Sequence, residues 1–136
     1  MSTNTIYIKC TYDGAGNRDL FLAVRDNGRL FLTDFTNKHI WVKNVHINDA
    51  SLFQLKHLHT EGNFMSSSKR RFRAIISGRQ TWLKENENDQ KLINTRLNES
   101  RFLGIRKKDG RMFWINEANI SQGFTQVICE FISTPS

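Results

Sequence analysis

Hydrophobic and polar residues alternate with a period of two along most of the 136-residue chain, in short runs separated by turn residues. This pattern is typical of β-strands with one buried face. The runs that show it lie at residues 5–12, 20–24, 29–35, 39–47, 71–75, 81–85, 91–95, 101–105, 111–115 and 125–131. Only residues 48–59 have some helical character, and that segment is short and rich in histidine. The sequence therefore predicts an all-β protein.

Two segments of the chain, residues 20–34 and 101–116, are variants of one hairpin: an apolar strand, a basic turn that contains glycine, and a second apolar strand. Asn27-Gly28 and Asp109-Gly110 are the dipeptides that favour tight hairpin turns. Residues 63–77 form a degraded copy, in which the turn has become a cluster of serine and arginine. The chain therefore contains an internal repeat.

Aromatic landmarks define the length of this repeat as about 41 residues. One set is Phe31, Phe72 and Phe113, and a second set is Trp41, Trp82 and Phe124. Because period-two alternation does not create agreement at this longer spacing, we expect three units of about four strands each. The units form one domain over residues 1–136, with boundaries near 1–50, 51–88 and 89–136.

Three units of four short strands are too few for most propellers, and they resemble the β-trefoil. The resemblance implies a barrel of six strands with a cap of three hairpins. It also implies that the first and last strands are neighbours, which would bring Cys10 and Cys129 close together. Two cysteines in apolar runs make neither a disulfide framework nor a metal motif, so we expect buried free thiols.

The second aromatic set stands in the tripeptides HIW (39–41), QTW (80–82) and QGF (122–124), which resemble the Gln-x-Trp signature of ricin-type lectins. The resemblance implies that this second set packs in the core, and we expect the threefold register to place the first set there as well. In ricin-type sites, an acidic residue of the second strand holds the sugar hydroxyls with charge-assisted bonds. Ala23, Ser66 and Gly104 stand at that position here, so a galactose site of the ricin form is not expected.

Polar residues in loops and hairpin turns are the alternative candidates for a glycan site, because carboxylates and amides hydrogen-bond sugar hydroxyls. These candidates are Asp26, Asn27, Asp34, Asn37, Gln80, Asn116, Asn119 and Gln122. Our first functional hypothesis is therefore a lectin-like module that binds a glycan or glycoconjugate.

The net charge is +7, and residues 51–111 hold fourteen Lys and Arg against six Asp and Glu. Such a field attracts polyanions. The candidates for binding a sulfated polysaccharide or nucleic acid are Lys69, Arg70, Arg71, Arg73, Arg79, Arg106, Lys107, Lys108 and Arg111. A polyanion binder is therefore our second functional hypothesis. The alternative is a set of solvated turns without a ligand, which would have the same composition.

The segment RFLGIRKKDGR (101–111) is similar to a hairpin of the fibroblast growth factors, and a related strand and turn occur in fascin-like trefoils. The first resemblance implies that Arg106, Lys107 and Lys108 contribute to a heparin site. The rest of that site would lie before the final strand, where residues 116–123 contain no cation, so half of the motif is present. A protein-binding trefoil (a protease inhibitor, a cytokine-like protein or a cytoskeletal ligand) is our third hypothesis, although no loop has an inhibitory sequence.

Motifs of catalysis are missing from the sequence: it has no Gly-rich phosphate loop and no nucleophile elbow. Its four histidines, His39, His46, His57 and His59, lack carboxylates or cysteines at ligand spacing. We expect no enzyme activity, no metal and no cofactor.

No apolar run approaches the roughly 20 residues of a membrane helix, and the first residues do not resemble a secretory signal. We therefore expect a cytoplasmic protein, or one exported by an unconventional route, and the sequence sets no oligomeric state.

Overall fold

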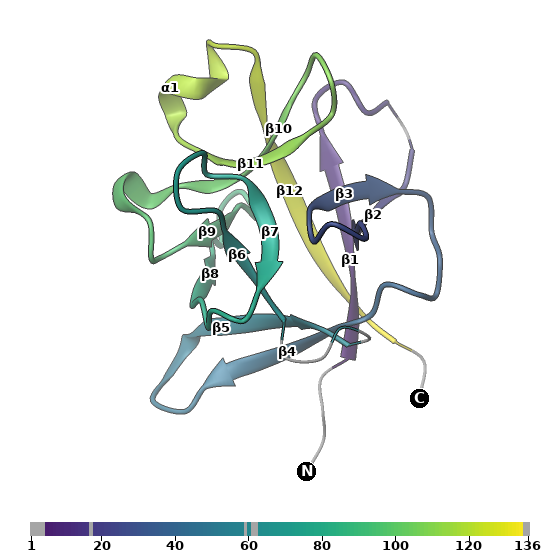
Figure 1. Ribbon diagram of the computed structural model, residues 1–136, viewed down its shortest axis with the longest axis vertical. Helices are drawn as coiled ribbons and strands as arrows, with labels where there is room; N and C mark the ends of the chain where they lie inside the picture. The colour runs from purple at the N-terminus through teal and green to yellow at the C-terminus, as the bar shows by residue number, and fades with distance from the viewer. Residues whose placement is uncertain (1–4, 17, 59, 61–62, 135–136) are drawn as a thin grey trace.

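The computed structural model describes residues 5–16, 18–58, 60 and 63–134, and within them the chain forms an antiparallel β structure with two short helical segments (Figure 1). The elements are β1 (Thr5–Tyr12), β2 (Leu20–Val24), β3 (Leu30–Thr33), β4 (Trp41–His46), β5 (Asp49–His57), β6 (Phe64–Ser67), β7 (Ala74–Ser77), β8 (Leu83–Glu85), β9 (Leu92–Asn94), the 3-10 helix η1 (Asn98–Ser100), β10 (Phe102–Arg106), β11 (Met112–Ile115), α1 (Glu117–Ile120) and β12 (Phe124–Ser133). The predicted all-β class is confirmed. Most of the segment predicted to have helical character forms strand β5, which pairs with β4, and His59 at its end lies outside the described residues.

Six strands form a closed ring. Strand β1 pairs with both β12 and β4, and the ring continues through the pairs β4–β5, β5–β8 and β8–β9. A bridge between Lys91 and Ile128 closes the ring from β9 to β12, together with a hydrogen bond from the Cys129 N–H to the Gln90 carbonyl at 3.1 Å. No helix in the described part of the chain is long and apolar enough to cross a membrane.

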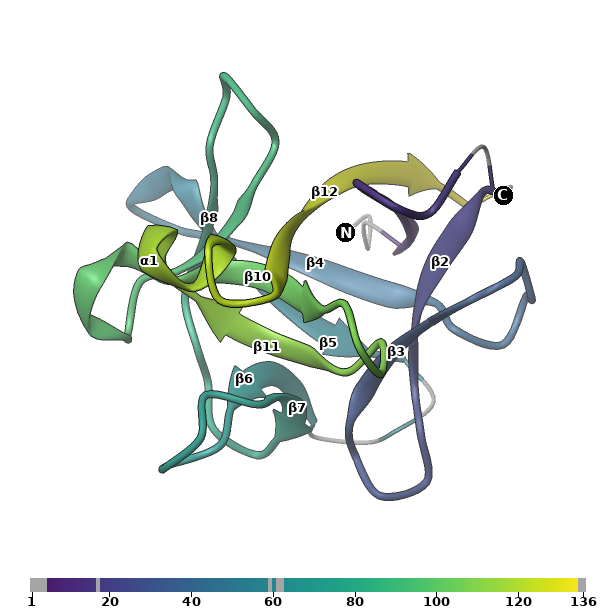
Figure 2. The same cartoon turned by 90° about the horizontal axis from the view of Figure 1, so that it is seen from above.

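Three hairpins, β2–β3, β6–β7 and β10–β11, extend from this ring through the pairs β1–β2, β5–β6 and β9–β10. The three hairpins lie on the same side of the ring (Figure 2), and backbone hydrogen bonds join the first to the second and the second to the third. The Ile76 N–H of β7 donates to the Gly28 carbonyl at 2.8 Å, and the Trp114 N–H of β11 donates to the Phe72 carbonyl at 2.7 Å. The fold therefore places the turn of the first hairpin beside the second hairpin, and the turn of the second beside the third.

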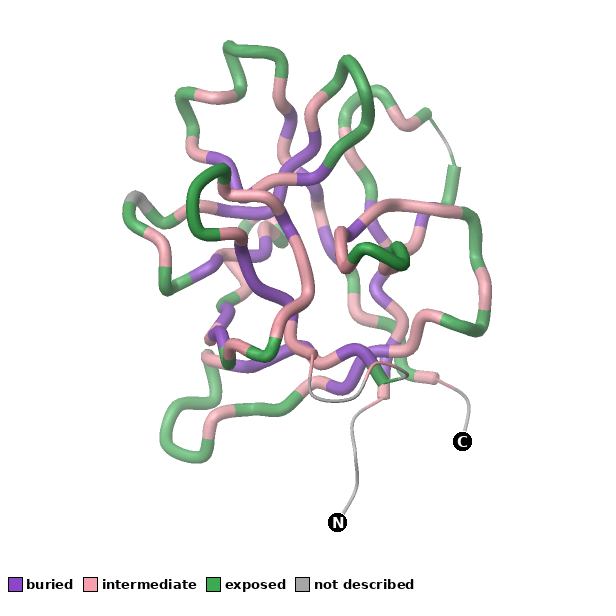
Figure 3. Tube along the Cα trace, in the orientation of Figure 1, coloured by how far each residue is buried: buried purple, intermediate pink, exposed green. Residues whose placement is uncertain are grey.

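The core lies inside the ring and under the hairpins, as the buried segments in Figure 3 show. Every strand contributes a buried apolar residue, since each has one face toward the interior. One such residue from each strand in turn is Ile8, Leu22, Leu30, Trp41, Leu55, Met65, Ala74, Leu83, Leu92, Leu103, Trp114 and Val127. The two buried indoles are also hydrogen-bonded: Trp41 Nε1 donates to the Leu22 carbonyl at 3.2 Å, and Trp114 Nε1 donates to the Ser66 carbonyl at 2.9 Å.

The aromatic landmarks do not form two core triplets. Of the second set only Trp41 is buried, whereas Trp82 and Phe124 are half-buried. Trp82 instead packs edge-on against His46, with ring centroids 4.6 Å apart. The third unit fills the core with Trp114, which is not in either set. The expectation of equivalent core aromatics was therefore wrong for Trp82 and Phe124.

The three phenylalanines of the first aromatic set are also half-buried. Phe31 and Phe113 lie directly after the buried Leu30 and Met112 and therefore face outward in their strands. Phe72 precedes β7 and has a φ of 54°, a left-handed turn conformation. The 41-residue spacing thus joins residues of different local structure. The prediction that this set packs the core was wrong for Phe31 and Phe113, whereas Phe72 does pack against the buried core cluster.

Candidate anion-binding site

The turns of the three hairpins end with arginine at the same structural position. The Arg25 N–H donates to the Arg29 carbonyl at 2.8 Å, and the Arg106 N–H donates to the Arg111 carbonyl at 2.8 Å. In the middle hairpin the Ser68 N–H donates to the Arg73 carbonyl at 3.1 Å. Arg29, Arg73 and Arg111 therefore each stand where the chain leaves a turn and enters the returning strand.

Bridges between neighbouring hairpins bring two of these arginines to a junction. Arg29 forms a β-bridge with Ile75 of the second hairpin, and Arg73 forms one with Phe113 of the third. Among the described residues, no backbone hydrogen bond makes the corresponding link from the third hairpin to the first. The hairpins are thus joined on two sides and open on the remaining side.

A cavity of about 260 Å³ lies at this open side. Its walls come from the first and third hairpins, and Arg73 of the second also lines it. The charged side chains that line it are Arg25, Arg29, Arg73, Asp109 and Arg111. Four arginines and one aspartate therefore line a single cavity, and this excess of positive charge is an environment for an anion.

The arginines repel one another in this arrangement. The pKa of Arg73 is lowered, first by partial burial and then by the positive charges of Arg29, Arg71, Arg111 and Arg106. Arginine stays protonated at neutral pH despite such a shift, so the repulsion remains in the protein. Bound negative charge would offset it.

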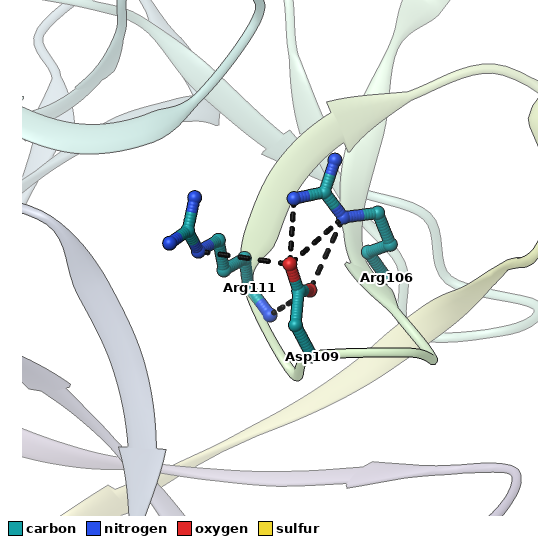
Figure 4. A network of polar contacts seen from close by, with 3 residues as sticks. All are labelled: Arg106, Asp109 and Arg111. Atoms are coloured by element: carbon teal, nitrogen blue, oxygen red, sulfur yellow. Dashed lines mark hydrogen bonds and ion pairs between the residues drawn. The ribbon is translucent and has the colours of Figure 1, made fainter.

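Asp109 neutralises one end of the cluster (Figure 4). Arg106 holds this carboxylate with Nη2 donating to Oδ2 at 2.6 Å and Nε donating to Oδ1 at 3.1 Å. The Arg111 guanidinium is more distant, with Nε 3.6 Å from Oδ2. The pKa of Asp109 falls to about 2, chiefly because of the hydrogen bond from Arg106, so this group is ionised at neutral pH.

Arg29 and Arg73 have no such partner, since no carboxylate in the described part of the chain forms an ion pair with either side chain. Their charge is therefore available to a ligand, whereas that of Arg106 is largely used by Asp109.

Two members of the first aromatic set, Phe31 and Phe113, line the cavity and support guanidinium groups. The Arg25 guanidinium carbon lies 4.2 Å from the centre of the Phe31 ring, and the Arg106 carbon lies 4.9 Å from that of Phe113. Cation–π contacts of this kind restrict the arginine side chains without using their N–H donors. The recurring phenylalanines thus act as platforms for cations.

The predicted cations do not all reach the cavity. Arg73 and Arg111 line it, whereas Arg71 and Arg106 do not line it but are near enough to lower the pKa of Arg73. The other predicted cations do not line the cavity; they are Lys69, Arg70, Arg79, Lys107 and Lys108.

Sequence reasoning missed Arg25 and Arg29, although both flank Asn27-Gly28. The repeat aligns this turn with residues 106–111, and that alignment was the signal that could have identified them.

A second, larger cavity of about 920 Å³ contains three of the predicted glycan residues: Asp26, Asn27 and Asn37. His39 and His57 also line it, with His39 Nδ1 3.2 Å from His57 Nε2. The two cavities share Arg25 and Asn27 as lining residues. The turn of the first hairpin is therefore the wall between them.

The other predicted glycan residues lie outside both cavities and contact protein groups. Asp34 forms an ion pair with Arg18 at 3.1 Å, and Gln80 Oε1 accepts from Gln54 Nε2 at 3.5 Å.

The remaining three glycan candidates, Asn116, Asn119 and Gln122, bond to one another at helix α1. The Asn116 N–H donates to Asn119 Oδ1 at 2.9 Å, and the Asn119 N–H donates to Asn116 Oδ1 at 3.1 Å. Asn119 Nδ2 donates to Gln122 Oε1 at 2.9 Å. These side chains organise the loop between β11 and β12.

The three residues that replace the ricin-type acid are all buried. Ala23 and Ser66 have no exposed surface, and the Ser66 hydroxyl lies 2.7 Å from that of Thr81. Gly104 is covered by Ile115 and Thr125. A sugar has no access to this position in any of the three units.

Within the described residues, no group of three or more His, Cys, Asp or Glu side chains is placed to hold a metal ion. No family model, curated protein sequence or solved structure matches the chain.

Proposed function

We propose that this protein is a non-enzymatic β-trefoil binding module that binds anionic ligands at the cavity lined by Arg29, Arg73 and Arg111. The closed ring of six strands with three hairpins supports the trefoil assignment, because it is the arrangement that the resemblance of the sequence to the β-trefoil implies.

One observation carries the functional part of the proposal: an arginine leaves each of the three turns at the same position, and all three line one cavity. A guanidinium group presents a planar fork of donors that matches the oxygens of phosphate and sulfate. Because Arg29 and Arg73 form no ion pair among the described residues, an anion gains their charge without displacing a carboxylate. The binding free energy should therefore depend on these two arginines more than on the exposed lysines of the turn tips.

The test compares two variants with the same loss of charge. In the first, Arg29→Gln is combined with Arg73→Gln; in the second, Arg79→Gln is combined with Lys84→Gln, which do not line the cavity. Binding of heparin fragments of uniform length is measured by calorimetry at physiological salt, after circular dichroism has shown that both variants fold. We expect the cavity variant to lose at least about tenfold in affinity, equal to about 1.4 kcal/mol, and the control to lose less than about threefold.

Equal losses in the two variants would contradict the proposal, because they would assign the attraction to the overall positive field. Absence of binding to the unmodified protein would also overturn it.

A further inference from the structure

The wall between the two cavities presents groups of two kinds to a ligand. Asn27 Oδ1 accepts from the Arg29 N–H at 3.0 Å, which orients the amide and leaves Nδ2 without an acceptor among the described residues. Arg25 lies on the Phe31 ring and forms no ion pair within the described part of the chain. The turn therefore offers one neutral donor and one cation at the border of the two cavities.

The larger cavity combines neutral polar groups with an apolar surface. Asn37, Thr60 and Asn63 supply amide and hydroxyl groups, and apolar surface comes from Val24, Ile40 and Ile76. Sugars need both, because their hydroxyls require hydrogen-bond partners whereas their C–H faces pack on apolar side chains. Asp26 adds an exposed carboxylate, which would repel a continuous row of phosphates.

The same lining is poorly suited to a nucleobase. Single-stranded nucleic acids are bound by stacking of bases on exposed aromatic rings. No Phe, Tyr or Trp from the described residues lines the larger cavity. Of its two imidazoles, that of His57 is buried and packs edge-on against Trp41, with ring centroids 5.1 Å apart. In the smaller cavity, the Arg25 guanidinium covers the ring of Phe31.

We infer that the ligand is a saccharide that carries a sulfate or phosphate ester. The ester group binds in the arginine cavity, the adjoining sugar binds in the larger cavity, and the turn at Arg25 and Asn27 contacts both parts. This inference rests on the proposed anion-binding function and narrows it from any polyanion to an anionic saccharide.

The test separates the two cavities with a second variant. Asn37→Ala combined with Asn63→Ala changes only the larger cavity without changing the net charge, and neither side chain forms a hydrogen bond within the described part of the chain. Binding is measured for a sulfated oligosaccharide, its desulfated form, the same oligosaccharide with phosphate esters, inorganic sulfate, and a single-stranded oligonucleotide of equal charge. The same ligands are measured with the Arg29→Gln, Arg73→Gln variant.

We expect the larger-cavity variant to bind the sulfated oligosaccharide at least about fivefold more weakly, with unchanged binding of inorganic sulfate. The arginine variant should weaken the binding of both. The ratio of affinities for the sulfated and phosphorylated oligosaccharides then identifies the preferred ester, and a measurable affinity for either one supports the inference. In spectra of the unmodified protein, the backbone amides of Asn37 and His39 should shift with the oligosaccharide and not with inorganic sulfate.

Two results would overturn the inference while leaving the proposed function intact. One is an unchanged saccharide affinity in the larger-cavity variant while the arginine variant loses binding. The other is an oligonucleotide that binds as tightly as the sulfated oligosaccharide. If none of the anions binds the unmodified protein, the proposed function itself fails.

Discussion

Cys10 of β1 and Cys129 of β12 stand directly opposite each other, with their sulfur atoms 3.9 Å apart. Both side chains are fully buried and the thiols are free. The neighbouring first and last strands that the trefoil resemblance implies are thus present, and the expectation of buried free thiols is confirmed. The pKa of Cys10 is raised by its hydrogen bond with Cys129 and by burial, so the thiol stays protonated at neutral pH.

Both cysteines should resist modification in the folded protein. Maleimide acts on the thiolate, so at pH 8 we expect very slow labelling of the native protein and rapid labelling of two thiols in denaturant, measured by mass spectrometry. A folded state that holds the Cys10 proton more tightly is most stable below the ordinary thiol pKa of 9.0 and loses this stability as the pH rises. Equally rapid labelling of native and unfolded protein would show that the thiols are accessible.

The three tryptophans should differ sharply in their contribution to stability. Trp114 is fully buried and hydrogen-bonded, so we expect Trp114→Ala to lower the free energy of unfolding by about 3–5 kcal/mol. Trp82 is half-buried and contacts His46 at the surface, so Trp82→Ala should cost on the order of 1 kcal/mol. Urea unfolding measures both values. Similar decreases in the free energy of unfolding for the two variants would indicate that Trp82 also packs in the core.

Gly104 should not tolerate a side chain. A Cβ atom there would lie 2.4 Å from Ile115 Cδ1 and 3.0 Å from the Thr125 carbonyl oxygen. We expect Gly104→Ala to lower the free energy of unfolding by about 1–3 kcal/mol, as overpacking does. Gly78→Ala is the matched control, because no atom lies within 4 Å of the added Cβ. If chemical denaturation gives the same midpoint for both variants, the packing at Gly104 is looser than the structure indicates.

Asp109 should make stability depend on pH in the acid range. Its pKa is lowered from 3.8 to about 2, so the folded state favours the carboxylate. This contribution is present above pH 3.8 and is lost as the pH falls through about 2. We expect the melting temperature of the unmodified protein to fall more steeply between pH 4 and pH 2 than that of Asp109→Asn. Parallel curves, or a carboxyl titration near pH 4 by NMR, would contradict the ion pair with Arg106.

Asn116 should contribute to stability and not to saccharide binding. As the N-cap of α1 it accepts from the Asn119 N–H, and loss of such a cap costs about 0.5–2 kcal/mol. We expect Asn116→Ala to lower the free energy of unfolding by this amount in urea titrations and to leave the affinity for the sulfated oligosaccharide unchanged. A weaker saccharide affinity with an unchanged free energy of unfolding would indicate that Asn116 contacts the saccharide.

Much of the local structure is predictable from the sequence alone. Alternation marked ten of the strand segments, because a strand with one buried face repeats its chemistry every second residue. The turn at Asn27-Gly28 was also predictable, since Gly28 has a φ of 85°. The basic character of the turns followed directly from composition.

Alternation alone left open which of two neighbouring residues faces the core, because a shift of one residue exchanges the two faces of a strand. In β3 the choice fell on Leu30 rather than Phe31, and in the third hairpin on Met112 and Trp114 rather than Phe113. The tertiary packing determines which face of each strand is buried. Phe31 and Phe113 therefore lie on the other face, where they contact the guanidinium groups of Arg25 and Arg106.

The candidate site depends most strongly on tertiary structure. The chain alone shows basic turns with Asn-Gly and Asp-Gly dipeptides, because these are properties of contiguous residues. Arg29, Arg73 and Arg111 line one cavity because of how hairpins that are far apart in sequence pack together. β-Bridges join the first hairpin to the second and the second to the third, and the cavity lies between the third and the first. Contacts between distant segments determine which charges share a site, and no local pattern contains that information.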